Sequence, residues 1–332
     1  MSVRQQSERP RLLVKCGGFS SQLARNVQEQ VDGDPLWGSR FDATHPEAVT
    51  KTHLDFLRKG ADIILTNTYQ SSVEGFMQHL GVTREQSIAL IERSVHLAKQ
   101  AKAKYLDEVA LMNNQLAPDL PWILASIGPY GAHLHDGSEY SGNYSQQVNA
   151  KQLQQWHTQR LDTCVAAGVD GLAVETLPCQ LEAVAVTELI LTRYPTAKFW
   201  VSFQCKDSSS LASGESFAEA ALAVWELVST HQAQSRLLGI GVNCLNPSYV
   251  TPLLKTLLAI KPAQASIPLV VYSNRGESYD SNHGWTGSGQ NVATFVPEWL
   301  KLGVRIVGGC CRVYPDDVLE IRRCVDDMDK QP

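Results

Sequence analysis

The sequence VRIVGGCCR, residues 304–312, joins a strand signal to a pair of adjacent cysteines. Its run of β-branched residues predicts a buried strand, and two glycines end that strand. Glycine lets the backbone come close to other atoms, so Cys310 and Cys311 can present their sulfurs together. The sequence GIGVNC, residues 239–244, is a second apolar strand that ends in a cysteine, Cys244. These two strand ends suggest a common site.

The same pattern of an apolar strand followed by a helix recurs along the chain. We expect strands at 11–15, 61–65, 122–126, 171–174, 199–203, 237–242, 268–272 and 304–307. We expect helices at 46–60, 83–104, 151–167, 181–193, 216–229, 292–302 and 315–325, with a further helix that begins at 247. Near-continuous apolar strands predict a parallel sheet, and eight such units predict a single (β/α)8 TIM barrel.

An open doubly wound sheet is the competing arrangement. The barrel is favoured because the unusual residues all follow strands, on the face where barrel enzymes keep their chemistry. These residues are Gly17, Gly18, Glu175, Cys244, Asn274, Cys310 and Cys311. Two inserted loops on that C-terminal face, residues 19–41 and 132–149, could roof a pocket. We therefore expect one barrel domain over residues 11–328, preceded by a flexible N-terminus at residues 1–10.

Composition narrows the class of protein. The 332 residues are 43% hydrophobic and 19% charged, with a formal net charge of −5, which is ordinary for a globular protein. The absence of a basic run argues against nucleic acid as a partner. No apolar stretch is long enough to span a membrane, and residues 1–10 show no secretory signal. Eight cysteines without such a signal favour a reducing compartment, so we expect a cytoplasmic protein.

We interpret Cys244, Cys310 and Cys311 as three thiolate ligands of one zinc ion. Three protein ligands leave one position open, which is typical of catalytic sites, and a further thiol suits that position. Two alternatives remain: buried apolar cysteines, or a redox pair formed by Cys310 and Cys311. Cys16 also ends a strand and could add a thiol near the site. The other cysteines are assigned to packing: Cys164, Cys179, Cys205 and Cys324.

Other side chains at the expected mouth suit a charged small molecule. Glu175 directly follows the fourth strand, and its natural partner is an ammonium group. Gly17 and Gly18 could present backbone N–H groups to a carboxylate, although a tight turn explains them equally well. Aromatic rings, which stabilise cations, gather in the same region: Trp37, Tyr69, Tyr130, Tyr140, Tyr279 and Trp285.

These residues identify a family resemblance. From about residue 11 to 325 the chain resembles the homocysteine S-methyltransferase family. The most specific matches are GVNC at 241–244 and GGCCR at 308–312, which are similar to the family's zinc-ligand motifs. SIGPYG at 126–131 and DGSEY at 136–140 resemble the branch that uses sulfonium donors. LTNTY at 65–69 and ETLPC at 175–179 also match in place.

The resemblance implies a barrel in which zinc on the three cysteines binds the sulfur of homocysteine. The thiolate would attack the methyl group of S-methylmethionine or S-adenosylmethionine and give methionine, and betaine is the less expected donor. Glu175 is the expected catalytic residue and would hold the amino group. The residues assigned to substrate binding are Gly17, Gly18, Thr66, Asn67, Tyr69, Glu175, Asn243 and Asn274. No nucleic-acid or membrane partner is expected, and a monomer would suffice.

Two positions depart from the family pattern. Cys16 stands where the family usually has aspartate, and Arg275 stands where a small residue is usual. The first change removes a carboxylate expected near the amino group, so binding of the amine would rest on Glu175. An alternative function follows: a catalytically weak thiol- or zinc-binding paralogue with altered ligand recognition.

Overall fold

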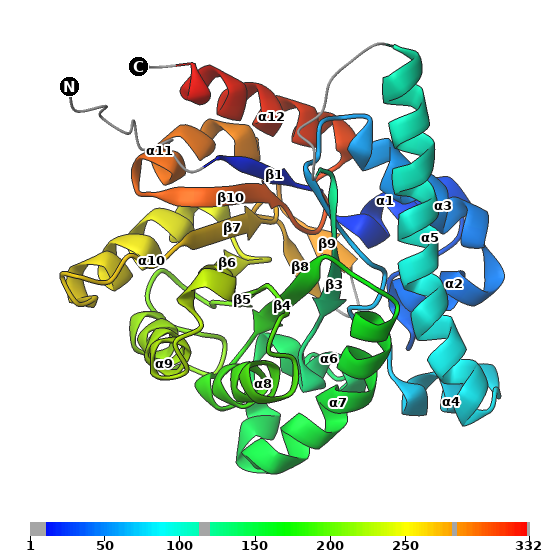
Figure 1. Ribbon diagram of the computed structural model, residues 1–332, viewed down its shortest axis with the longest axis horizontal. Helices are drawn as coiled ribbons and strands as arrows, with labels where there is room; N and C mark the ends of the chain where they lie inside the picture. The colour runs from blue at the N-terminus through cyan, green and yellow to red at the C-terminus, as the bar shows by residue number, and fades with distance from the viewer. Residues whose placement is uncertain (1–10, 113–119, 281–283, 331–332) are drawn as a thin grey trace, which may run out of the picture.

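A computed structural model of the chain describes residues 11–112, 120–280 and 284–330. Eight parallel strands close into a barrel, in the order β1-β10-β7-β6-β5-β4-β3-β2 around the ring (Figure 1). The last strand returns to pair with the first, which excludes the open doubly wound sheet and confirms the TIM barrel. The barrel strands are β1 (Leu13–Lys15), β2 (Ile63–Leu65), β3 (Trp122–Ile127), β4 (Gly171–Leu177), β5 (Phe199–Phe203), β6 (Leu237–Asn243), β7 (Leu269–Ser273) and β10 (Val304–Gly309).

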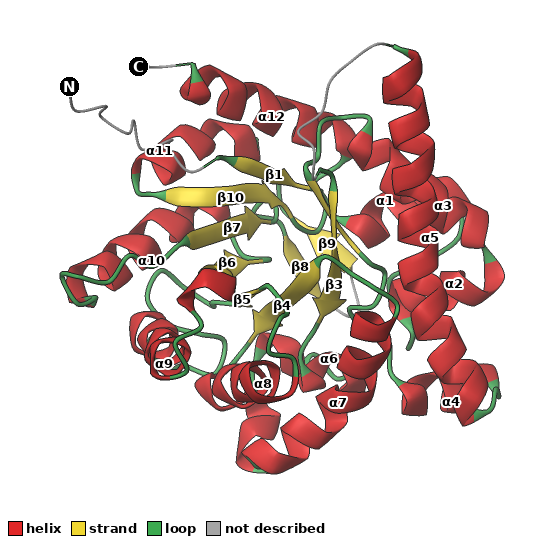
Figure 2. Ribbon diagram, in the orientation of Figure 1, coloured by secondary structure: helices red, strands yellow, loops and turns green. Residues whose placement is uncertain are grey.

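Helices surround the barrel on its outside (Figure 2). The helices that alternate with the strands are α3 (Pro46–Leu57), α5 (Arg84–Leu111), α7 (Ala150–Ala166), α8 (Gln180–Arg193), α9 (Phe217–Thr230), α10 (Pro247–Ile260), α11 (Val296–Lys301) and α12 (Pro315–Asp329). Thr83 caps α5 together with Gln86, which confirms the predicted start of that helix. The helix runs past its predicted end at residue 104 because residues 105–111 contain no glycine or proline.

Inserted segments occupy the C-terminal face of the barrel. Residues 19–41 form α1 (Phe19–Val27) and η1 (Trp37–Arg40) and lead into α2 (Phe41–Thr44). The second insertion contains α6 (Tyr130–Leu134), η2 (Ser138–Tyr140) and η3 (Asn143–Gln146). Smaller elements are α4 (Val73–Leu80), η4 (Gln234–Arg236), η5 (Val292–Thr294) and an antiparallel hairpin of β8 (Ser278–Asp280) and β9 (Gly284–Thr286), which was not predicted. Residues 1–10, expected to be flexible, lie outside the described residues.

The barrel strands are almost entirely buried, so a polar side chain on one of them is unusual. All residues of β4, β5 and β7 are buried, as expected for a parallel sheet that is covered on both faces. Buried polar side chains on the barrel strands lie mainly towards the carboxyl ends: Lys15, Ser126, Glu175, Thr176, Ser202, Asn243 and Ser273. The barrel therefore directs polar groups to the face that the insertions cover. Within the described residues, no helix is long and apolar enough to cross a bilayer.

Candidate active site

The three predicted cysteines meet at the C-terminal end of the barrel. The sulfurs of Cys244, Cys310 and Cys311 all lie within 4.8 Å of one another, and Cys244 Sγ is 3.6 Å from Cys311 Sγ. Four-coordinate zinc with bonds of about 2.3 Å needs sulfurs about 3.8 Å apart, so the cluster fits such an ion. The strand between the two cysteine segments, β7, holds both of them. Cys244 N donates to Tyr272 O at 3.1 Å, and Cys310 N donates to Ser273 O at 2.8 Å.

Glycines at the ends of β1 and β10 allow these segments to pack backbone against backbone. A Cβ atom on Gly18 would lie 2.5 Å from the carbonyl oxygen of Cys310, and one on Gly308 would lie 2.5 Å from that of Lys15. Gly18 N donates to Val313 O at 2.8 Å. Its amide is therefore engaged within the fold, which supports the packing interpretation of this glycine. Gly17 and Gly18 both line the cavity described below, and a role in carboxylate binding stays a prediction.

Glu175 lies on β4 and faces the same cavity as the sulfurs. Its side chain is buried, and Ser126 Oγ donates a hydrogen bond to Oε1. Burial raises the pKa of Glu175 to about 7, although the positive charge of Lys15 lowers it in part. Near neutral pH this carboxylate can therefore gain its charge when a cationic group binds beside it.

Lys15 is a site residue that the sequence analysis did not single out. It is the last residue of β1, and its buried Nζ donates to Gly309 O at 2.9 Å and to Gly17 O at 3.3 Å. The ammonium lies 4.7 Å from the centre of the Tyr272 ring. A charged residue at the end of an apolar strand was the available signal.

The charges at the barrel mouth act on one another. The pKa of Cys310 lies well below its ordinary value because Cys244 and Cys311 donate hydrogen bonds to its sulfur, and the charge of Lys15 adds to the effect. Burial raises the pKa of Cys16, so this thiol stays neutral near pH 7. Cys16 lines the cavity but does not belong to the sulfur cluster found among the described residues.

The residues after β2 have two different roles. Thr66, Asn67 and Tyr69 all line the cavity, and their role in substrate binding stays a prediction. The Asn67 amide, however, donates to Gly38 O at 2.7 Å and to Asp42 Oδ1 at 3.2 Å, so it also holds the first insertion in place. The Thr66 hydroxyl is also engaged, because it accepts from Ser126 N at 3.1 Å and lies 2.6 Å from Thr68 Oγ1. Tyr69 thus remains the stronger candidate for contact with a ligand.

Asn243 and Asn274 are used inside the fold, and neither is among the described residues that line the cavity. Asn243 binds Thr176 twice, accepting from its N–H and donating to its Oγ1, each at 2.8 Å. Thr176 has a φ of 62° and Cys244 has a φ of 54°, a conformation that is unusual for residues with a Cβ. Asn243 therefore stabilises the strained backbone at Thr176, the residue after Glu175, and itself directly precedes the strained residue Cys244. Asn274 accepts from Gly276 N at 2.8 Å and shapes the loop after β7.

One cavity of about 740 Å³ joins the sulfurs, Glu175 and both insertions. Its described lining is acidic: Asp32, Asp34, Asp136, Glu139 and Glu175 contribute carboxylates, and Lys15 is the one lysine or arginine. Trp37, Tyr69 and Tyr140 line it with aromatic rings, as predicted. Tyr130 does not line it, because its ring packs against Tyr144 and Trp156. The side chains of Tyr279 and Trp285 lie outside the described part, and Arg275 packs against Gly289 away from the cavity.

Glu139 lies on η2, residues 138–140, which form part of the roof of the cavity. Among the described residues its buried Oε2 atom has no hydrogen-bond partner. Burial raises the pKa of Glu139 to about 7, and the nearby charge of Asp136 adds to the effect. A buried carboxylate oxygen without a partner is costly, so this position favours a cationic or hydrogen-donating ligand.

The chain is similar to known homocysteine methyltransferases in both sequence and structure. A sequence model of the homocysteine S-methyltransferase family matches residues 13–325. A Drosophila melanogaster protein named betaine-homocysteine S-methyltransferase is 65% identical over 322 residues, which are 97% of this chain and 96% of that protein. Homocysteine S-methyltransferase 2 of Arabidopsis thaliana is 33% identical over 92% of this chain and 91% of its own length. The metallated form of the Escherichia coli homocysteine methyltransferase MmuM has a TM-score of 0.78 and 32% identity, with 95% of this chain and 96% of that chain covered.

Proposed function

This chain belongs to the homocysteine S-methyltransferase family. We propose that it transfers a methyl group from a sulfonium donor to homocysteine and that the reaction depends on a zinc ion. The donor would be S-methylmethionine or S-adenosylmethionine, and the product would be methionine. The observation that carries the proposal is the convergence of three sulfurs, one buried carboxylate and an acidic, aromatic roof on a single cavity.

Zinc is the metal that the donor set fits best. Thiolates are soft ligands that suit zinc, and hard cations such as magnesium prefer oxygen. The similarity to an E. coli enzyme solved in a metallated form supports a metal at this place. When bound by Cys244, Cys310 and Cys311, zinc would keep the homocysteine sulfur in its nucleophilic thiolate form.

The side chains around the cysteines would orient homocysteine. Glu175 would accept hydrogen bonds from its ammonium group, and Thr66 and the turn at Gly17, which line the same cavity, would hold its carboxylate. The transfer needs no general acid: the thiolate forms the new carbon–sulfur bond as the donor's carbon–sulfur bond breaks, and the donor leaves as a neutral thioether. Positioning the two sulfurs in line with the methyl group would then supply most of the catalysis.

The charge of the cavity favours a sulfonium donor. S-methylmethionine and S-adenosylmethionine each carry a sulfonium, an ammonium and a carboxylate, so their net charge at neutral pH is positive, whereas betaine is net neutral. A cavity lined by several carboxylates attracts the former more strongly. Betaine is nevertheless a second candidate. The Drosophila relative carries its name, and aromatic rings such as Tyr69 and Tyr140 also suit a quaternary ammonium.

A methyl-transfer assay with zinc analysis on the same sample tests the proposal. We expect the purified protein to hold one zinc per chain and to convert homocysteine with a sulfonium donor at least about tenfold faster than with betaine, the ratio that about 1.4 kcal/mol of preference gives. Equal or faster turnover with betaine would reverse the donor assignment. Stoichiometric zinc without turnover would favour the weak paralogue, and a metal-free protein that cycles a disulfide would favour the redox alternative.

Removing the charge of Glu139 should weaken binding of the methyl donor without weakening binding of homocysteine. We expect Glu139→Gln to raise the KM of the sulfonium donor about tenfold, because a charge-assisted hydrogen bond is lost. The homocysteine KM should stay unchanged. The carboxylate loses its charge as the pH falls through about 7, so the wild-type donor KM should rise between pH 8 and pH 6. The variant should lose this dependence. Steady-state kinetics at several pH values measure both effects, with the exposed Glu226→Gln on α9 as control.

A further inference from the structure

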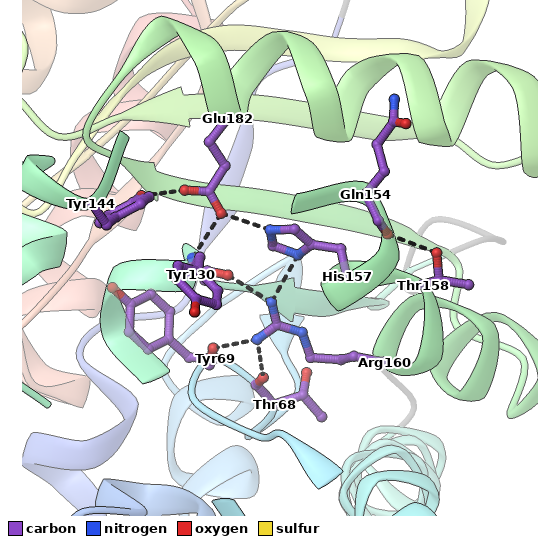
Figure 3. Close-up of polar contacts among 10 residues, drawn as sticks. Thr68, Tyr69, Tyr130, Tyr144, Gln154, His157, Thr158, Arg160 and Glu182 are labelled. Carbon is purple, nitrogen blue, oxygen red and sulfur yellow. Dashed lines mark hydrogen bonds and ion pairs between the residues drawn. The ribbon is translucent and has the colours of Figure 1, made fainter. Parts of the chain in front are cut away.

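A buried arginine binds the backbone of two barrel loops at once (Figure 3). Arg160, on α7, donates from Nη1 to Tyr69 O at 2.6 Å and to Thr68 O at 3.3 Å. Its Nη2 donates to Gly128 O at 2.6 Å. The planar guanidinium thus joins the loop after β2 to the loop after β3 through three carbonyl groups.

A histidine and a glutamate complete the cluster and balance its charge. Arg160 Nη2 donates to His157 Nδ1 at 3.1 Å, and His157 Nε2 lies 2.7 Å from Glu182 Oε1. These partners assign a neutral imidazole that carries its proton on Nε2, and burial lowers the pKa of His157 accordingly. A positive arginine and a negative glutamate are therefore connected through one neutral ring, all three side chains being buried.

Glu182 extends the cluster to the second insertion. Its Oε1 accepts from Tyr130 N at 2.7 Å, and its Oε2 accepts from the Tyr144 hydroxyl. These two residues flank η2, which carries Glu139. A Cβ atom on Gly131 would lie 2.7 Å from Glu139 N, so the start of α6 and the roof are in direct backbone contact. A shift of α6 would therefore move the roof.

The same cluster fixes the ring of Tyr69. A Cβ atom on Gly128 would lie 2.7 Å from two carbons of that ring, so Tyr69 packs directly on the Gly128 backbone. Arg160 holds the carbonyl groups of both residues. The Tyr69 side chain is thus positioned by the loop that it belongs to and by the loop on which it rests.

The hydrogen bonds of the cluster end on the loops after β2 and β3 and on the second insertion. In the part of the chain that the structure describes, the hydrogen bonds of the three side chains reach residues 68–69, 128–130 and 144. The sulfurs are held instead by β7. We infer that Arg160, His157 and Glu182 form a positioning unit for the methyl-donor side of the active site, acting through the backbone on Tyr69 and on the roof at residues 138–140. The donor assignment of that side rests on the function proposed above.

Stability alone does not explain such a cluster. Buried ion pairs can often be replaced by apolar residues without loss of stability, because taking charges out of water is costly. What an apolar replacement cannot supply is a fixed fork that holds three carbonyls in register. Misplacement of a reacting group by about 1 Å can cost on the order of 100-fold in rate, so positioning of this kind has a large effect on catalysis.

Arg160→Lys tests the inference, since lysine keeps the charge but loses the planar fork. We expect the donor KM to rise about tenfold or more, in the range that small misplacements produce. The zinc content should stay unchanged, and the homocysteine KM should rise less than the donor KM, because Thr66 lies in the same loop but is not held directly by Arg160. Arg193→Met is the matched control, because Arg193 joins α8 to Asp162 on α7 in a bidentate pair at the surface. It should change neither KM.

A double variant identifies the route. If Arg160 acts through Tyr69, most of the effect of Arg160→Lys on the donor KM should vanish in a Tyr69→Ala background, because coupled residues are not additive. Equal changes in both substrates' KM values, an unchanged donor KM, or additive effects in the double variant would overturn the inference.

Hydrogen exchange gives a readout that does not depend on the donor's identity. In Arg160→Lys, amide exchange should become faster in residues 66–70 and 128–145 and should stay unchanged around the cysteines. If that variant is globally unfolded, Glu182→Gln, which keeps the shape of the side chain, replaces it in the same measurement. Uniform or absent changes would overturn the inference. If the sulfonium assignment is wrong, the wild-type protein will show no preference for a sulfonium donor over betaine. If the positioning unit is wrong, the differences expected between the wild type and its variants will be absent.

Discussion

The Cys310→Ala variant is expected to purify without stoichiometric zinc and to lose methyl transfer almost completely. Even changes to groups that only orient metal ligands cost 10- to 100-fold in metal affinity, so removing a ligand should weaken zinc binding by more than about 100-fold. The remaining sulfurs of Cys244 and Cys311 lie 3.6 Å apart and can supply only two ligands. Metal analysis, competition with a chelator and turnover of homocysteine measure the loss.

Two further cysteines serve as controls for that result. Cys324→Ala, on the outer helix α12, should keep both zinc and activity. Cys16→Ala is the sharper comparison, because Cys16 lines the cavity but stands outside the sulfur cluster. We expect it to retain zinc. If Cys310→Ala kept full zinc content and full turnover, the three-thiolate mechanism would be wrong, and if Cys16→Ala lost zinc, Cys16 would be a fourth ligand.

The barrel and the sulfur cluster could be predicted because both follow from local patterns. Apolar strands that alternate with amphipathic helices identify the fold, and residues after the strands of a parallel barrel share one face. Cys244 and the Cys310–Cys311 pair end strands that both neighbour β7. Their convergence therefore required only the correct strand order.

The residues that sequence reasoning missed depend on side-chain direction and on contacts between distant elements. Lys15 reads as the end of a strand, and only the register of β1 with β10 turns its ammonium towards Gly309. Asn243 and Asn274 lie at strand ends like the residues that line the cavity, yet the side chains of both form hydrogen bonds with neighbouring backbone N–H groups. Arg160 lies on a helix where a charged residue usually indicates a solvent face, so its burial against two barrel loops carried no local signal.

Glu175→Gln should be nearly as damaging as the loss of a cysteine, but through homocysteine alone. The substitution keeps the size of the side chain and removes the charge that would hold the substrate ammonium. A hydrogen bond to a charged group contributes about 1.5–3 kcal/mol, so the homocysteine KM should rise about 10- to 150-fold. The neutral Cys16 thiol, in the place of the family's usual aspartate, offers no second carboxylate to compensate.

The pH dependence separates this role from a purely structural one. Burial raises the pKa of Glu175 to about 7, so the wild-type carboxylate gains a proton as the pH falls below that value and loses its attraction for an ammonium group. The homocysteine KM should therefore rise between pH 8 and pH 6 in the wild type and stay flat in Glu175→Gln. Zinc content should not change, because the cysteines hold the metal. A variant that lost zinc, or that weakened donor and homocysteine equally, would show that Glu175 supports the barrel mouth as a whole and does not bind the amino group.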